Sequence, residues 1–255
     1  MSHALYVAWR SGNSEQGSWG PVGKLECNDG LYLYYYTRGA KKLPGFQPFP
    51  EMSDLEQVYE SEELFPLFEN RLLSKSRPEY DQFLYWGGFD ADNPPDPISI
   101  LGVTEGIRET DGIEVFPCPR PDSSGCCLNK FFLHGVRHMA TDAIRRISGL
   151  QKDERIILEP EPSNNYDANA MAVWTLDRSH KIGYVPRYLA HEVRRLNEEC
   201  RSDIVSLAVE RVNSDAPLQQ RVLCRMRACW LEGFQPCNTD DFVPIPSNAA
   251  FLAAG

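Results

Sequence analysis

The chain has 255 residues and a mass of 29.0 kDa, which is enough for one large domain or two domains of ordinary size. Its composition, 42% hydrophobic and 24% charged, is that of an ordinary soluble protein, and no apolar run approaches the roughly 20 residues that a membrane-spanning helix needs. The net charge of −10 argues against a protein that coats duplex DNA nonspecifically.

In the first half, alternating apolar residues and amphipathic spacings predict a small α+β unit: a strand meander, two short helices and a closing pair of segments. The hairpin turn is expected at residues 28–30, and Ser61 is the expected N-cap of the first helix. The expected strands are 4–9, 21–26 and 30–36, the helices are 62–73 and 78–86, and the closing segments are 97–104 and 111–116.

Two Pro-rich segments, 90–97 and 117–125, interrupt these patterns because proline continues neither a helix nor a central strand. The first contains Asp90 and Asp92 but lacks the Gly and distal Glu of a calcium loop, so it is expected to be a solvated loop. The second is the better domain boundary. The sequence therefore predicts an acidic domain at 1–122, a second domain at 128–237 and a C-terminal tail at 238–255.

The second half reads as mostly β-structure, with an amphipathic segment at 143–147 and a helix at 186–199. A small antiparallel barrel with a covering helix is the economical arrangement, because a barrel leaves no exposed strand edge. The expected strands are 130–136, 155–160, 170–176, 180–184, 204–212 and 223–230.

The acidic residues are concentrated in the first half of the chain. Residues 1–127 contain 10 Lys and Arg against 20 Asp and Glu, whereas residues 128–237 contain 16 against 14. The second half can therefore contain a local basic site in spite of the acidic total.

The N-terminus lacks the basic and apolar regions of a signal peptide, so we expect a cytoplasmic protein whose eight cysteines are reduced thiols. Cys126 and Cys127 precede His134 and His138, but these histidines have helical spacing within an expected strand. An exposed cysteine pair in a loop is favoured over a closed zinc site. We expect no metal and no cofactor.

The connection at 163–169 is unusually polar, with Ser163, Asn164, Asn165 and Asp167 around Tyr166. Asn and Asp side chains hold a loop by bonding neighbouring backbone N–H groups, and this purely structural role remains open for Asp167. It does not explain Tyr166, because an aromatic ring in a polar connection either packs down or presents a face to a ligand.

Three segments together, "FFLHGVRH", "ILEPEPSNNYDANAMAVW" and "KIGYVPRYLA", resemble the HIRAN domain in order, spacing and residue type over about residues 128–237. The resemblance implies an OB-like β-barrel that binds single-stranded DNA, with capture of a free 3′ end in the best-known member. The site residues that it implies are Arg137, His138, Asn164, Tyr166, Asp167, Tyr184 and Arg187.

Each implied role has a physical basis. Tyr166 and Tyr184 are stacking or packing surfaces, and base stacking on an aromatic ring contributes roughly 1–3 kcal/mol. Arg137 and Arg187 are expected to contact phosphate, and Asp167 to accept from the terminal 3′-hydroxyl. A role for Tyr184 inside the barrel remains equally open.

The chain departs from the family pattern after Arg137. A pair of tyrosines in the helicase-factor domain is replaced by His138 and Met139, which weakens one stacking surface. The affinity or the preference for DNA ends is therefore open.

The first half resembles the small N-terminal subdomain of HipA-type toxin kinases, through "GPVGKLECNDGLYLYYYTRGA" and "LFPLFENRLLSKSRPEY". The sequence lacks the kinase core of that family, so the resemblance does not imply phosphotransfer activity. Amphipathic helices closing a small sheet explain the same spacings. The matching residues are Phe65, Phe68, Glu69, Asn70, Leu72 and Leu73.

The favoured function is a non-catalytic bacterial DNA-binding protein that recognises single-stranded DNA or 3′ DNA ends, in DNA repair or phage defence. The alternative is a protein-interaction subunit of a toxin–antitoxin or defence system, whose acidic half docks a HipA-like kinase or another effector. A DNA-processing hydrolase is disfavoured, because clustered carboxylates with a Lys, a phosphate-binding Gly loop and motor motifs are missing.

Overall fold

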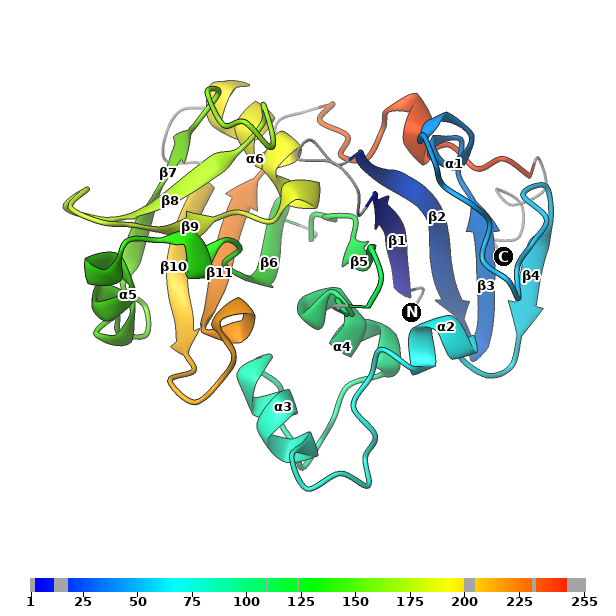
Figure 1. The fold of residues 1–255 in the computed structure, drawn as a ribbon, viewed down its shortest axis with the longest axis horizontal. Helices are drawn as coiled ribbons and strands as arrows, with labels where there is room; N and C mark the ends of the chain where they lie inside the picture. The colour runs from blue at the N-terminus through cyan, green and yellow to red at the C-terminus, as the bar shows by residue number, and fades with distance from the viewer. Residues whose placement is uncertain are drawn as a thin grey trace. The chain divides into compact units, whose positions relative to one another are not determined.

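The computed structural model describes residues 3–11, 18–108, 110–122, 124–199, 205–230 and 233–246. The chain forms two compact units (Figure 1), one of Met1–Arg77, Pro95–Cys118 and Cys237–Gly255 and the other of Pro78–Pro94 and Pro119–Pro236. Among the described helices, none has both the length and the apolar character needed to cross a bilayer.

The first unit is built on a five-stranded antiparallel sheet of order β4-β3-β2-β1-β5. Its core contains Leu25, Tyr34 and Tyr36, all fully buried on one face. The elements are β1 (His3–Arg10), β2 (Trp19–Asn28), β3 (Leu31–Tyr36), α1 (Gly39–Lys42), β4 (Val58–Ser61), α2 (Pro66–Glu69), α4 (Pro97–Thr104), β5 (Ile113–Pro117) and the 3-10 helix η3 (Asp240–Phe242).

The predicted turn between β2 and β3 is confirmed. Asn28 pairs with Leu31, and Asp29 and Gly30 between them have φ of 48° and 89°. Two successive residues with positive φ are required by the tight hairpin turn whose twist matches that of the strands.

The predicted helix at 62–73 is wrong, as is the N-cap role of Ser61. Ser61 ends β4, and its Oγ accepts a bond from the backbone N–H of Glu63 at 3.1 Å. The helix in this segment, α2, is a single turn that begins at Pro66. Proline disfavours helical geometry in the preceding residue, and Phe65 accordingly has an extended ψ of 138°.

The described part of the predicted tail, up to residue 246, docks on the first unit. Pro244 forms a bridge with Thr37, and the backbone N–H of Ile245 donates to the carbonyl of Tyr36 at 2.9 Å. Lys42 forms ion pairs with Asp240 at 2.7 Å and Asp241 at 2.6 Å. Residues 247–255 lie outside the described residues.

The second unit contains a curled, six-stranded antiparallel sheet of order β6-β11-β10-β7-β8-β9, an OB-compatible half-barrel. The predicted strands are confirmed within a few residues, except that residue 204 is not described and that β6 begins earlier. The elements are α3 (Tyr80–Trp86), β6 (Cys126–Phe132), the 3-10 helix η1 (Val136–His138), α5 (Thr141–Ser148), β7 (Arg155–Pro160), β8 (Met171–Thr175), β9 (Lys181–Tyr184), α6 (Arg187–Glu199), β10 (Val205–Val212), the 3-10 helix η2 (Leu218–Gln220) and β11 (Val222–Cys229).

The chain after β6 connects the two ends of this sheet. The backbone N–H of Leu133 still donates to the carbonyl of Val222, the first residue of β11, and His134 then forms two backbone bonds with Tyr184 of β9, at 3.0 and 2.9 Å. Gly183 permits this approach, because a Cβ there would lie 2.8 Å from the carbonyl oxygen of His134. The sheet therefore bends so far that β9, at one edge, contacts the segment that follows β6, the strand at the other edge.

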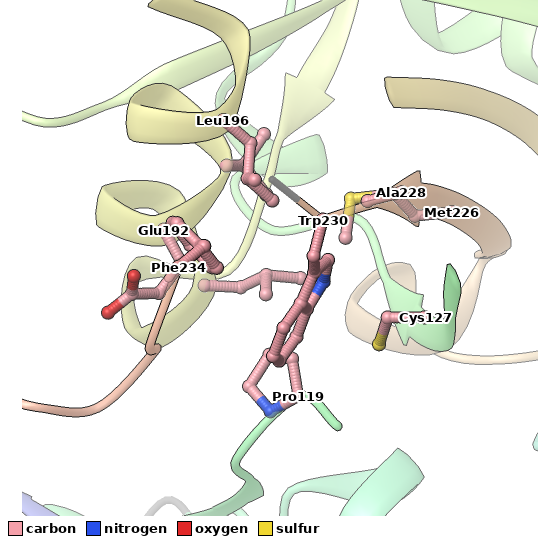
Figure 2. A pocket seen from close by; sticks show the side chains of 10 residues that line it. Pro119, Cys127, Glu192, Leu196, Met226, Ala228, Trp230 and Phe234 are labelled. Carbon is pink, nitrogen blue, oxygen red and sulfur yellow. The ribbon is translucent and has the colours of Figure 1, made fainter. Parts of the chain in front are cut away.

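Helix α6 is anchored on the sheet by an apolar seam (Figure 2). Leu196 of α6 contacts Ala228 of β11, and Trp230 and Phe234 complete the cluster. The cavity left inside the seam is about 10 Å³, near the lower limit for a single water molecule. The seam is thus packing that fixes the helix, with no room for an organic ligand.

Helix α3 packs within the second unit, whereas the sequence predicts it in the domain at 1–122. Asp215 accepts bonds from Gln82 at 3.0 Å and from the indole of Trp86 at 3.2 Å, and the Arg211 guanidinium lies 3.8 Å from the ring centre of Tyr85. Residues 78–94 consequently belong to the second unit by contact, in spite of their place in the sequence.

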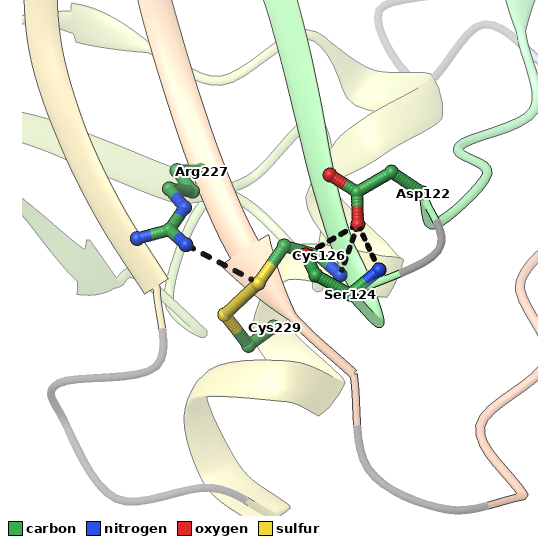
Figure 3. The surroundings of a disulfide bond; sticks show 5 residues. All are labelled: Asp122, Ser124, Cys126, Arg227 and Cys229. Carbon is green, nitrogen blue, oxygen red and sulfur yellow. Dashed lines mark hydrogen bonds between the residues drawn. A yellow bond between two sulfur atoms is a disulfide. The ribbon is translucent and has the colours of Figure 1, made fainter.

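The expectation of an exposed cysteine pair in a loop, with all thiols reduced, is wrong. Cys126 and Cys127 are buried in β6, and Cys126 forms a disulfide with Cys229, its register partner in β11 (Figure 3). The Cα atoms of the pair are 4.1 Å apart. Asp122 caps the turn before β6 by accepting the Cys126 N–H at 3.2 Å. Sequence spacing could not show this pairing, because 103 positions separate the two residues.

The disulfide predicts a redox-dependent stability of the second unit. Reduction, or Cys229→Ser, is expected to lower its free energy of unfolding by about 2–5 kcal/mol, because the bond closes a loop of roughly 100 residues in the unfolded chain. Urea denaturation with and without a dithiol measures the loss. Cys118→Ser, at a half-buried cysteine outside the disulfide, is the control. Alkylation of every cysteine in the native protein without reductant would contradict the disulfide.

Candidate nucleic-acid interface

The connection between β7 and β8 is held in shape by its own side chains. Asn164 Oδ1 accepts bonds from the backbone N–H groups of Tyr166 at 3.0 Å and Asp167 at 3.2 Å. Asp167 Oδ1 accepts from the N–H of Asn169 at 2.9 Å. Such side-chain bonds replace regular secondary structure. The structural role therefore holds for Asn164, and for one of the two oxygens of Asp167.

The ring of Tyr166 is not buried against the domain. Its side chain is 73% exposed, the largest fraction among the exposed large hydrophobic residues of the described chain. The Asn164 bonds fix the backbone on both sides of the ring. A rigid loop that presents an aromatic face to solvent is the arrangement on which a base can stack.

Asp167 and Arg187, predicted from separate segments, lie side by side. Asp167 Oδ2 is 4.0 Å from Nε of Arg187, the first residue of α6. Helix α6 begins here because the carbonyl of Pro186 accepts the bonds from Leu189 and Ala190 that form its first turn. The pair combines an acceptor and a cation at the residue that directly follows Tyr166.

Tyr184 takes part in a polar network that sequence reasoning missed. Its hydroxyl donates to Glu161 Oε2 at 2.7 Å, and Lys181 Nζ lies 2.9 Å from both that hydroxyl and Glu161 Oε1. Glu161 Oε2 also accepts from the Asn164 amide at 3.0 Å. The network connects the end of β9 to the loop, so the barrel role of Tyr184 is the one that its contacts support.

The network changes the acidity of its members. Partial burial alone would raise the pKa of Glu161, but the bonds from Tyr184, Asn164 and Lys181 outweigh it and lower that pKa. Burial would likewise lower the pKa of Lys181, yet its bonds to Tyr184 and Glu161 raise it. Both groups are therefore held in their charged forms.

A β-bulge places Lys181 and Tyr184 within reach of each other. Between β8 and β9 the register shifts, with Trp174 paired to Lys181 and Val173 to Gly183, so that Ile182 has no partner in the pairing. Simple alternation would put Lys181 and Tyr184 on opposite faces. Their adjacency could not be read from the sequence, although Glu161 and Lys181 do flank the motifs.

Arg137 and His138 are exposed on η1, where Arg137 Nε donates to Nε2 of His138 at 2.9 Å. The turn into η1 passes through Gly135, whose φ is 70°. A Cβ on Gly135 would lie 3.0 Å from the Tyr184 ring, which shows how closely η1 approaches β9. This contact brings the arginine–histidine pair to the Tyr184 side of the site.

Residues 129–228 match the family profile of the HIRAN domain. This segment is a HIRAN domain. It covers most of the second unit, and the match confirms the family resemblance of the second half. No match is found among curated protein sequences.

Two solved structures resemble part of the chain. A Lactobacillus plantarum protein has 22% identity and a TM-score of 0.33, and the alignment covers 41% of this chain and 99% of that one. The HIRAN domain of human HLTF has 15% identity and a TM-score of 0.28, with coverage of 42% of this chain and 78% of that one.

The HIRAN domain contains the predicted residues in two groups. The loop and the start of α6 supply Tyr166, Asp167 and Arg187, and η1 supplies Arg137 and His138. Across the described ranges, no group of three or more His, Cys, Asp and Glu side chains is arranged to hold a metal ion.

Glu161→Gln is expected to destabilise the HIRAN domain by about 1.5–3 kcal/mol at pH 7, because hydrogen bonds to a charged group have this magnitude. Since folding lowers the pKa of Glu161, its stabilisation is present above the ordinary value of 4.5 and is lost as pH falls through the folded value. The difference between variant and wild type should therefore shrink as the pH falls below 4.5, as followed by urea denaturation.

Glu159→Gln is the matched control. Glu159 lies in β7, two residues before Glu161, and pairs with the exposed Arg178 at 3.2 Å, so its loss should change stability by only about 0–1 kcal/mol. Equal effects of the two substitutions at pH 7 would contradict the importance of the Glu161 network.

Proposed function

We propose that the HIRAN domain binds single-stranded DNA and holds a free 3′ end beside Asp167. One observation supports this most directly: Tyr166, which is 73% exposed, directly precedes Asp167 in the chain, and the Asp167 carboxylate has the Arg187 cation 4.0 Å away. Stacking, phosphate attraction and hydroxyl recognition are the elements from which sequence-independent single-strand binding is built.

In this proposal, Tyr166 stacks on the terminal base and Arg187 attracts the adjacent phosphate. Asp167 Oδ2 accepts from the 3′-hydroxyl, while Oδ1 remains bonded to the loop. Arg137 and His138 contact the strand from η1. Tyr184 and Asn164 support the site through Glu161, and they need not touch the DNA.

The end chemistry gives the sharpest prediction. Replacing a 3′-hydroxyl oligonucleotide by its 3′-phosphate should weaken binding about tenfold or more, because the phosphate oxygens face the Asp167 carboxylate and cannot donate to it. A 5′-phosphate should change little. Fluorescence anisotropy with a labelled oligonucleotide at fixed low salt measures all three ligands.

Asp167→Asn should reduce the discrimination between the two 3′ ends, and Arg187→Ala should weaken both ligands alike. Because Asp167 also holds the loop, a melting curve must show that the variant is folded. Equal wild-type affinity for the 3′-hydroxyl and the 3′-phosphate would exclude end capture.

Tyr166→Ala should reduce the affinity for single strands by about 1–3 kcal/mol with little loss of stability, since the ring is exposed. Tyr166→Phe keeps the stacking face and should retain most of the affinity. Leu176→Ala removes a comparably exposed apolar side chain from the β8–β9 turn and is the control. Undiminished binding by Tyr166→Ala would exclude stacking on this ring.

A second function is favoured by the acidity of residues 1–127, which carry 20 acidic against 10 basic side chains. We propose as the alternative that the first unit, with its resemblance to the HipA-type N-terminal subdomain, docks a kinase or another effector of a toxin–antitoxin or defence system. Copurification from the native host, repeated at high salt, tests this because screening weakens charge-driven contacts.

We further propose a non-catalytic role in the cytoplasm of a bacterium, in repair or defence. The disulfide provides a test of location, because such bonds are rare in reducing compartments. Rapid alkylation in intact cells tests this location, because recovery of an intact Cys126–Cys229 bond would contradict residence in a reducing cytoplasm.

A further inference from the structure

A groove lies beside the proposed end site, between the β7–β8 connection and α6. Its volume is about 460 Å³, and it is open to solvent. The loop side contributes Ala168 and Asn169, which directly follow Asp167, and the helix side contributes His191, Arg194 and Arg195. The groove therefore adjoins the loop segment of Asp167, where the 3′ end is proposed to bind.

Basic side chains recur along the helical wall of the groove. Arg187, His191 and Arg194 are separated by four and three positions, so they lie on one face of α6. Seven residues of helix rise about 10 Å, which corresponds to roughly three nucleotides of a stacked strand. The stripe starts at Arg187, the residue that pairs with Asp167.

Arg194 is oriented across the groove by two acceptors. Its Nη1 donates to the backbone carbonyl of Ala168 at 2.6 Å, and its Nε donates to Glu198 Oε1 at 2.8 Å. The first bond fixes the guanidinium against the loop. The second is an i,i+4 ion pair to a carboxylate whose side chain is 54% exposed, a type of contact that contributes only about 0.3–0.5 kcal/mol.

The two carboxylates of this region differ in their availability. Glu192 is buried and lies 3.4 Å from both His191 and Arg195, so its charge is part of the helix packing. Glu198 is exposed and contacts Arg194 from the solvent side. A phosphate that approaches Arg194 would meet Glu198 as its competitor, and a guanidinium binds phosphate in the same planar geometry as carboxylate.

We propose that this groove binds internal phosphates of the DNA strand whose 3′ end is held at Asp167, with Arg194 as the phosphate contact and Glu198 as a competing carboxylate that weakens the binding. The proposal rests on the proposed function and assigns the path of the strand: from Asp167 past Arg187 and along α6.

The test compares a thymidine dinucleotide with an oligothymidylate of about ten nucleotides, both with 3′-hydroxyl ends, because strand-binding folds of this size cover about 4–16 nucleotides. Wild type should bind the longer probe more tightly. Glu198→Gln should tighten the longer probe by about threefold and leave the dinucleotide unchanged, because removal of one carboxylate favours phosphate binding without touching the end site.

Arg194→Gln should weaken the longer probe by about threefold to tenfold and reduce the slope of log affinity against log salt by about 0.7, the value for one phosphate contact on a single strand. The matched control is Arg178→Gln, which removes an exposed arginine from the β8–β9 turn and should leave both probes nearly unchanged.

The groove is excluded if Glu198→Gln leaves the longer probe unchanged, or if Arg194→Gln weakens both probes equally, which would show that it acts through the loop. If the dinucleotide binds as tightly as the longer probe, the groove proposal is overturned and the end-site proposal is retained. Length-dependent binding without dinucleotide binding supports the groove and overturns the end site. No binding of either probe overturns both.

Discussion

The second unit depends on one backbone contact, the pair of hydrogen bonds between His134 and Tyr184. These bonds connect the segment after β6 to β9, the opposite edge of the six-stranded sheet. Once the sheet is bent in this way, η1, the β7–β8 connection and the start of α6 gather around Tyr184. A flat sheet with the same strands would hold these segments apart, so the candidate interface is a product of curvature. Gly135 and Gly183 are required at this point because larger residues would collide with Tyr184 or His134.

The polar loop divides its side chains between structure and recognition. The side-chain oxygen of Asn164 accepts hydrogen bonds from the loop backbone. The carboxylate of Glu161 accepts hydrogen bonds from Tyr184 and Lys181. Tyr166, which they support, remains exposed. A flexible loop would lose conformational entropy when it became ordered on binding DNA. A loop that its own hydrogen bonds already hold in one shape has paid this entropy cost during folding, so its binding is less unfavourable. This explains why so many polar residues occupy so short a connection.

An acidic protein and a nucleic-acid interface are compatible here because charge acts locally. At physiological salt the Debye length is about 8 Å, so charges farther than this from the site are largely screened, whereas Arg187 and Arg194 act at contact distance. Glu198 and Glu192 lie among these cations and moderate their attraction. The arrangement is suited to modest, salt-sensitive binding of a single strand more than to tight coating of a duplex.

The sequence by itself determined the features that depend on local patterns. Period-two alternation located β7, β8 and β9, Asp29 and Gly30 specified a hairpin turn, and the spacing around Asn164, Tyr166 and Asp167 identified the HIRAN domain. Only the tertiary structure decided which distant residues meet. The bulge at Ile182 turned Lys181 toward Tyr184, strand register paired Cys126 with Cys229, and packing joined α3 to the second unit. Each of these follows from long-range contacts, for which neighbouring residues in the chain carry no periodic signal, so no local reading of the sequence could have found them.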